Sequence, residues 1–185
     1  IAETQICMII GTGKYTWETT MYTKRLLMIG AGFLQTFMIK KARALGYYVL
    51  SVDGNPKAEG FLYSNEFQCI DITDQEKCLA YAQKKRIDGV MTAATDYGVL
   101  TSSYIAQEMN LPGLKYSTAK RIKNKYQVRK TLFENSVDDT SQTFEISSDT
   151  NLDILKEKIE FPVMVKPCDG SGSRGASKVS EPEGL

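Results

Sequence analysis

The chain has 185 residues, of which 42% are hydrophobic and 24% are charged, and its formal net charge is +1 at pH 7. This balance excludes a strong electrostatic attraction to nucleic acid or to a membrane surface, and no apolar run approaches the roughly 18 residues of a membrane-spanning helix. The chain has no histidine, which excludes Ser-His and Cys-His nucleophiles and a Cys/His zinc site. The chain has four cysteines: Cys7, Cys69, Cys78 and Cys168. They form no C-x-x-C pair, and the chain shows no secretion signal, so we expect free thiols in a reducing, cytoplasmic compartment.

Residues 1–22 form an N-terminal extension of unassigned role. Gly13-Lys14 does not complete a phosphate-binding P-loop, because Met8 and Tyr15 stand where that motif requires glycine and Ser or Thr. From Lys24 onward, short apolar segments alternate with amphipathic ones. Strands are predicted over 24–30, 47–53, 66–71 and 87–96, and helices over 30–46, 74–85 and 97–110. The pattern predicts an α/β domain over 23–115, a Rossmann-like, doubly wound parallel sheet.

The composition changes after residue 115. A basic helical connector is predicted over 116–136, broken near Asn124, which can cap a helix that starts at Lys125. Residues 138–147 are predicted to form a polar turn that leads into a strand. A helix over 151–159, a strand over 161–167, a Gly/Ser loop over 168–175 and a returning strand over 176–180 follow. Residues 137–185 therefore read as the incomplete first part of an α+β domain, and the chain as a fragment of a longer protein.

The junction between the first predicted strand and helix carries Gly30 and Gly32, and Asp53 ends the next strand about twenty residues later. The third glycine of the dinucleotide pattern G-x-G-x-x-G is replaced by Gln35. Three interpretations stay open: an anion-binding loop for a substrate, an NAD(P) site and a purely structural turn. Asp96 ends the fourth strand at the same sheet edge, where it either faces a ligand or caps the next helix.

The segment VMVKPCDGSGSRGASKV places a lysine at the end of an apolar strand and a glycine-rich loop directly after it. A lysine ammonium at the end of a buried strand needs an anionic partner. The backbone N–H groups and hydroxyls of the loop, together with Arg174, could surround a polyphosphate that Lys166 contacts. In protein kinases the glycine loop precedes the corresponding lysine, so the order found here differs from theirs.

From Lys24 to Val179 the sequence resembles the ATP-grasp superfamily, specifically the carbamoyl-phosphate-synthetase and biotin-carboxylase branch. The motifs that carry the resemblance are KRLLMIGAG, NKYQVRKTLFENSV and FPVMVKPCDGSGSRGASKV. The resemblance implies a pre-ATP-grasp domain followed by the start of an ATP-grasp domain. It also implies that the ATP-binding residues are Lys125, Lys166, Gly170, Ser171, Gly172, Ser173, Arg174 and Gly175. The first-domain edge that faces the acceptor substrate would contain Gly30, Gly32, Asp53 and Asp96.

The resemblance further implies an ATP-dependent ligase that uses MgATP to activate a carboxylate or bicarbonate as an acylphosphate for attack by an amine. The Mg²⁺ ligands of the family lie downstream of the glycine loop, so none is assigned in this chain, which we expect to be inactive alone. ATP and a small carboxylate are the expected partners, with no nucleic acid or membrane, and an exposed interface would favour a homodimer. The alternatives are a non-catalytic nucleotide-binding or regulatory module and an NAD(P)-dependent oxidoreductase, which would need the completed glycine pattern.

Overall fold

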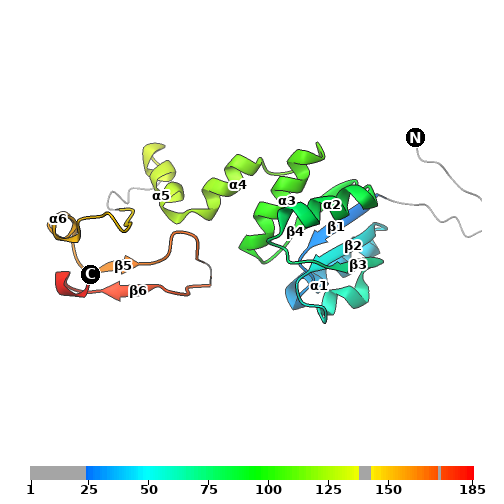
Figure 1. The fold of residues 1–185 in the computed structure, drawn as a ribbon, viewed down its shortest axis with the longest axis horizontal. Coiled ribbons are helices and arrows are strands. Elements are labelled where there is room, and N and C mark those ends of the chain that lie inside the picture. Colours follow the sequence, from blue (N-terminus) through cyan, green and yellow to red (C-terminus); the bar gives the residue numbers. More distant parts are fainter. Residues whose placement is uncertain (1–23, 138–142, 171) are drawn as a thin grey trace, which may run out of the picture. The chain divides into compact units, whose positions relative to one another are not determined.

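The computed structural model describes residues 24–137, 143–170 and 172–185 (Figure 1). The chain divides into two compact units, the second of which runs from Tyr116 to Leu185. The N-terminal extension over 1–22 lies outside the described residues. Within the described parts of the chain, no helix is both long and apolar enough to cross a membrane.

The first unit contains a four-stranded sheet in the order β3-β2-β1-β4, and every neighbouring pair is parallel. Its strands are β1 (Arg25–Ile29), β2 (Tyr48–Asp53), β3 (Glu66–Cys69) and β4 (Gly89–Thr92). They alternate with the helices α1 (Phe33–Ala44), α2 (Gln75–Lys85) and α3 (Asp96–Glu108), and a 3-10 turn, η1 (Glu59–Tyr63), follows β2. This confirms the predicted α/β fold with a parallel sheet.

Alternate residues of the strands point to opposite faces of the sheet and build two cores. On one face Leu27 and Leu50 pack with side chains from α2 and α3, such as Ala82 and Ile105. On the other face Met28 and Val49 pack with α1 and η1 through a cluster that includes Ile39, Ala42 and Phe61. Burying each large apolar side chain contributes about 1.5–3 kcal/mol. Helices on both faces make the sheet doubly wound, as predicted.

The end of α1 and the start of α2 each depend on the residues that flank the helix. Gly46 follows the last turn of α1 with φ +85° and donates to the carbonyl of Arg43 at 2.9 Å, as expected for a C-terminal glycine. The T-x-x-E pattern at Thr73 predicts a capping box, but Asp74 caps α2 by accepting from the N–H of Lys77 at 3.1 Å. The reason is that Thr73 donates both its N–H and its hydroxyl to Asp71 Oδ1.

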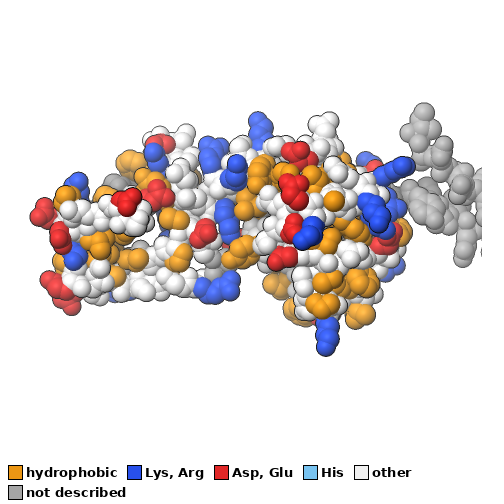
Figure 2. Space-filling model, in the orientation of Figure 1, with side chains coloured by type: hydrophobic (Ala, Val, Ile, Leu, Met, Phe, Trp, Pro, Cys, Tyr) orange, Lys and Arg blue, Asp and Glu red, His pale blue; other side chains and the backbone are white. Residues whose placement is uncertain are grey.

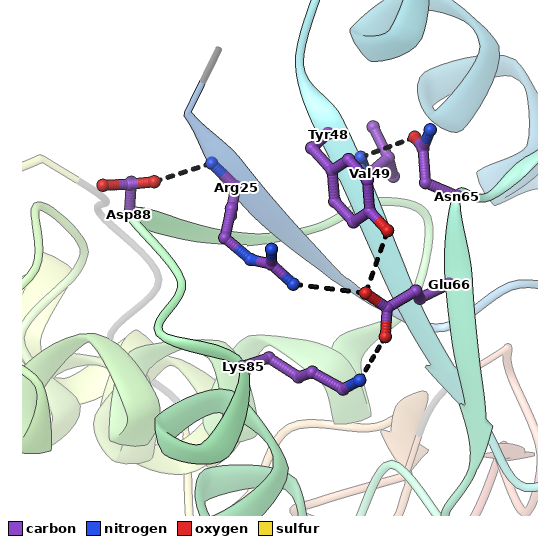
Figure 3. Close-up of polar contacts among 7 residues, drawn as sticks. All are labelled: Arg25, Tyr48, Val49, Asn65, Glu66, Lys85 and Asp88. Atoms are coloured by element: carbon purple, nitrogen blue, oxygen red, sulfur yellow. Dashed lines mark hydrogen bonds and ion pairs between the residues drawn. The ribbon is translucent and has the colours of Figure 1, made fainter. Parts of the chain in front are cut away.

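An ionic cluster joins three strands and α2 at the amino edge of this sheet (Figure 3). We call Arg25, Tyr48, Glu66 and Lys85 the amino-edge cluster. The Glu66 carboxylate accepts hydrogen bonds from Lys85 Nζ, from Arg25 Nη2 at 3.3 Å and from the Tyr48 hydroxyl at 2.9 Å. The hydrogen bond from Lys85 is the main cause that holds the pKa of Glu66 below its ordinary value.

The second unit begins with α4 (Tyr116–Lys123) and α5 (Lys125–Glu134), separated at Asn124. As predicted, Asn124 caps α5, accepting from the N–H of Gln127 at 3.0 Å. Further along the chain are α6 (Leu152–Lys156), the antiparallel pair β5 (Val163–Val165) and β6 (Ser177–Val179), and the 3-10 turn η2 (Pro182–Gly184).

The strand predicted within 138–147 is wrong in its described part, 143–147, which adopts no regular structure. Strands need a partner, and β5 and β6 pair with each other in the only sheet of the described part of this unit. Hydrophobic side chains reach the surface of the unit (Figure 2), and Phe133, Ile154 and Met164 are among those exposed.

Candidate functional site

The second unit brings a lysine and the glycine-rich loop together. Because Asn124 ends α4 and caps α5, Lys125 stands at the first position of α5. Its backbone N–H donates to the carbonyl of Cys168 at 2.8 Å, and its Nζ donates to the carbonyl of Gly170. Two residues that are 45 positions apart in the sequence, Lys125 and Gly170, therefore meet at the start of the loop.

The glycine-rich loop connects β5 to β6, and two of its glycines lie close to Pro167. A side chain at Gly170 would place its Cβ 3.2 Å from Pro167 Cβ, and one at Gly175 would lie 3.0 Å from Pro167 Cγ. Gly175 also has a positive φ of +71°, a conformation that glycine adopts without strain. Both ends of the loop therefore rest on the Pro167 ring, a role that the sequence analysis missed. Its only sequence signal is a proline followed by glycines at close spacing.

The other residues predicted to bind ATP lie along this hairpin. Lys166 directly follows β5 and is exposed, as are Gly172, Ser173 and Arg174. Ser173 has a positive φ of 57°, and a Cβ at Gly172 would meet no atom within 4 Å. Ser171 lies outside the described residues. The described part of the hairpin thus combines exposed cations with an open backbone, which suits an anionic ligand.

In the first unit, Gly30 and Asp53 lie at the carboxyl edge of the sheet and are engaged within the protein. Gly30 has φ +95°, and its N–H donates to the carbonyl of Val52 at 2.8 Å. The Asp53 carboxylate accepts from the N–H of Ala31 at 2.7 Å and from the N–H of Asn55 at 2.8 Å. One prediction placed a bound anion at the Gly30 turn. In the structure the Asp53 carboxylate occupies that turn.

Gln35 fills the space around the same turn. Its side chain is 7% exposed, and its Nε2 donates to the carbonyl of Ala93 in the loop after β4. A Cβ at Gly32 would lie 3.1 Å from the amide oxygen of Gln35. In a dinucleotide-binding turn, the third glycine, which Gln35 replaces here, allows close packing of the helix against the strand. The amide of Gln35 therefore disfavours the NAD(P) interpretation.

Asp96 lies at the carboxyl edge as well, but it does not cap α3. It is the first residue of that helix and is exposed, while Thr95 holds the N-cap position. A carboxylate in the first turn interacts favourably with the helix dipole. Gly30 and Gly32 thus follow β1, Asp53 ends β2 and Asp96 lies after β4. All four residues are at the edge where open α/β sheets bind ligands.

The described residues do not form a metal site: among them, no three Cys, Asp or Glu side chains gather closely enough to hold an ion. Asp169, which is exposed, is the one acidic residue of the loop segment 168–175. Mg²⁺ is bound through carboxylates and phosphate oxygens, and one exposed carboxylate does not supply such a ligand set.

The doubly wound sheet, the capped helix that begins at Lys125 and the glycine-rich hairpin are the features that carry the resemblance to the N-terminal part of ATP-grasp ligases. No protein-family model matches the chain. It is 26% identical, over 167 residues, to the formate-dependent phosphoribosylglycinamide formyltransferase of Prochlorococcus marinus, with 90% of this chain and 42% of that protein covered.

Solved structures agree with this assignment. Phosphoribosylglycinamide synthetase from Anaerococcus prevotii matches with a TM-score of 0.63 and 25% identity over 80% of this chain and 39% of that chain. N5-carboxyaminoimidazole synthetase from Staphylococcus aureus, complexed with ADP, matches with a TM-score of 0.68 and 20% identity over 88% of this chain and 43% of that chain. These comparisons confirm the resemblance to ATP-grasp ligases. The chain spans about two fifths of the length of these proteins.

Proposed function

We propose that this chain is the N-terminal portion of an ATP-dependent ligase that activates a small carboxylate for attack by an amine. The observation that carries the proposal is the meeting of Lys125 with the start of the glycine-rich loop. The resemblance assigns both to the ATP phosphates, and they lie together in one unit. The similar structure solved with ADP supports the choice of nucleotide.

The proposed reaction has two steps. A carboxylate oxygen attacks the γ-phosphorus of ATP, which forms an acylphosphate and releases ADP. The amine then attacks the acyl carbon and expels inorganic phosphate. Such phosphoryl transfer depends on positioning and on neutralising charge. It needs no nucleophilic side chain, which agrees with a chain that has no histidine.

Each candidate residue has a role in this proposal. Lys125 and Lys166 contact phosphate oxygens as point charges, and the exposed backbone over 172–175 offers N–H donors to the same phosphates, beside Arg174. In the first unit, Gly30 and Asp53 shape the turn, and Asp96 is the exposed carboxylate that can meet the amine. Mg²⁺, when bound, would neutralise phosphate charge through ligands outside this chain.

We further propose a one-carbon carboxylate such as bicarbonate as the acyl donor, which makes the reaction carbamoyl-phosphate-synthase-like. The formate dependence in the name of the similar formyltransferase supports this size class. A cytoplasmic location is proposed because the cysteines of the described residues, Cys69, Cys78 and Cys168, are free thiols. Homodimerisation is proposed through the exposed hydrophobic side chains of the second unit, such as Phe133 and Met164.

Calorimetry with MgATP tests the nucleotide site, first on the 185-residue chain and then on a longer natural form of the protein. Lys166→Ala should weaken binding at least about tenfold, which corresponds to about 1.4 kcal/mol. The matched control is Lys178→Ala, which removes an exposed lysine of the same hairpin. Equal affinities for wild type and Lys166→Ala would contradict the proposal that the phosphates bind at this loop.

Release of ADP tests the ligase chemistry. The longer form should release ADP only when a suitable carboxylate is present, and the 185-residue chain should release none. ATP binding without carboxylate-dependent ADP release in the longer form would favour the non-catalytic nucleotide-binding module. ADP release by the 185-residue chain alone would contradict the expected inactivity of this portion.

A further inference from the structure

We propose that Lys125 is a positioning residue for the glycine-rich loop: its ammonium group holds the Gly170 carbonyl and fixes the start of the loop before any nucleotide arrives. This goes beyond the phosphate contact that the proposed function gives to Lys125. It rests on hydrogen bonds within the chain, so it can hold or fail independently of the proposed function.

Two hydrogen bonds attach the loop to the first turn of α5. The backbone N–H of Lys125 donates to the Cys168 carbonyl at 2.8 Å, and the side-chain Nζ donates to the Gly170 carbonyl. The first bond depends only on the backbone and survives a change of side chain. The second bond comes from a charged donor, and such bonds are about twice as strong as neutral ones. The ammonium of Lys125 is therefore the part of this attachment that a substitution can remove.

The position of Lys125 is itself fixed by its neighbours. Asn124 caps α5 through its bond to the N–H of Gln127 at 3.0 Å, so the helix begins at Lys125. The lysine is half-buried, which limits the competition of water for its ammonium. A lysine at an exposed position of the same helix, such as Lys130, has neither restraint.

The loop has a second support at its other end. Gly175, at the end of the loop, and Gly170, near its start, both lie close to the Pro167 ring. The contacts with Pro167 do not hold the Gly170 carbonyl. The hydrogen bond from Lys125 Nζ holds it. With both ends held, the loop loses less conformational entropy when a ligand binds, which increases affinity through preorganisation.

The proposal predicts that one ammonium group has two separable effects. Because Nζ has three donor hydrogens, it can contact a phosphate oxygen and still hold a carbonyl. Removing it should therefore loosen the loop in the absence of nucleotide and also weaken nucleotide binding. A lysine that only contacts phosphate would show the second effect without the first.

Hydrogen–deuterium exchange on the 185-residue chain without nucleotide tests the proposal. Lys125→Met keeps most of the aliphatic stem and removes the ammonium. It should raise exchange in peptides covering residues 168–177 by about fivefold, the size expected for loss of one charged hydrogen bond at a half-exposed position. Lys130→Met is the matched control, because it removes the exposed lysine that lies 3.9 Å from Glu134 on the same helix, and it should leave these peptides unchanged.

Calorimetry with MgATP on the same variants separates this inference from the proposed function. Faster exchange in Lys125→Met supports the inference, even if neither protein binds ATP. Weaker ATP binding with unchanged exchange would overturn it and leave Lys125 as a phosphate ligand only. Exchange in β1 and β2 should be the same in all variants. If it rises as well, the comparison is repeated with Lys125→Leu, which also removes the donor, and unchanged loop exchange in that variant overturns the inference.

Discussion

Replacing Glu66 by glutamine should destabilise the first unit, because Glu66 is the one acidic residue of the amino-edge cluster. Its carboxylate accepts hydrogen bonds from Lys85, Arg25 and Tyr48, and its side chain is 30% exposed. Glu66→Gln keeps the shape but removes the charge that two cations share. Hydrogen bonds to charged groups contribute about 1.5–3 kcal/mol when buried, and exposed ion pairs contribute less than about 1 kcal/mol. For this partly exposed group we expect a loss of about 1–2 kcal/mol in the free energy of unfolding.

The loss should depend on pH in a defined direction. Hydrogen bonding to Lys85 lowers the pKa of Glu66 in the folded chain. The stability that the charged carboxylate contributes is therefore present above the pKa of the unfolded state and is lost as pH falls through the folded value. The difference between wild type and Glu66→Gln should be constant from neutral pH to about pH 5 and should shrink below about pH 4.

Urea denaturation followed by circular dichroism measures this difference, and exchange of the β2 amides assigns it to the first unit. Glu59→Gln is the control, because it removes an exposed carboxylate from the same unit and should change stability by less than about 0.5 kcal/mol. The reasoning is refuted if both variants lose equal stability, or if the difference grows as the solution is acidified.

Two further predictions concern the packing of the first unit. Gly60→Ala should destabilise it by about 2 kcal/mol or more in urea denaturation, because the new Cβ would lie 2.7 Å from the Ala31 carbonyl oxygen and 2.7 Å from Ile39 Cδ1. The control is Gly54→Ala, whose new Cβ would have its shortest contact at 3.4 Å and should reduce stability far less. Equal losses of stability in the two variants would contradict this account. Burial raises the pKa of the Cys78 thiol to about 12. A thiol reagent near neutral pH should therefore modify the exposed Cys69 in the folded chain and Cys78 only after unfolding, which peptide mass spectrometry measures. Modification of Cys78 in the folded chain would mean that its part of the core opens.

The sheet of the first unit could be predicted because its signals are local. Each strand is a short apolar run, and each helix has an apolar face at helical spacing, so the elements and the parallel direction of the strands follow from the sequence. The capping residue of α2, Asp74, did not follow, since Thr73 bonds back to Asp71 and leaves the cap to its neighbour. The strand predicted within 138–147 failed in its described part because an extended, polar segment forms a strand only when a partner strand is available.

The sequence proposes the residues of the candidate site, but it does not report their arrangement. The order of lysine and glycine loop in the sequence indicated that Lys166 and the loop belong together. That Lys125 contacts Gly170 depends on tertiary structure, which local patterns do not report. The replacement of the third glycine by Gln35 was visible in the sequence, and its consequence, an amide that packs over the turn, became visible only in the structure.

The Asp53 carboxylate at the Gly30 turn has a consequence for how ligands affect the melting of this protein. A domain whose turn is completed by a bound anion gains stability with ligand concentration by mass action. Here the negative charge is covalently part of the chain and already accepts the N–H of Ala31, so the turn is complete at any phosphate concentration. Titration with nucleotide should therefore leave the unfolding midpoint of the first unit in place, and any rise in thermal stability should come from the unit that contains Lys125.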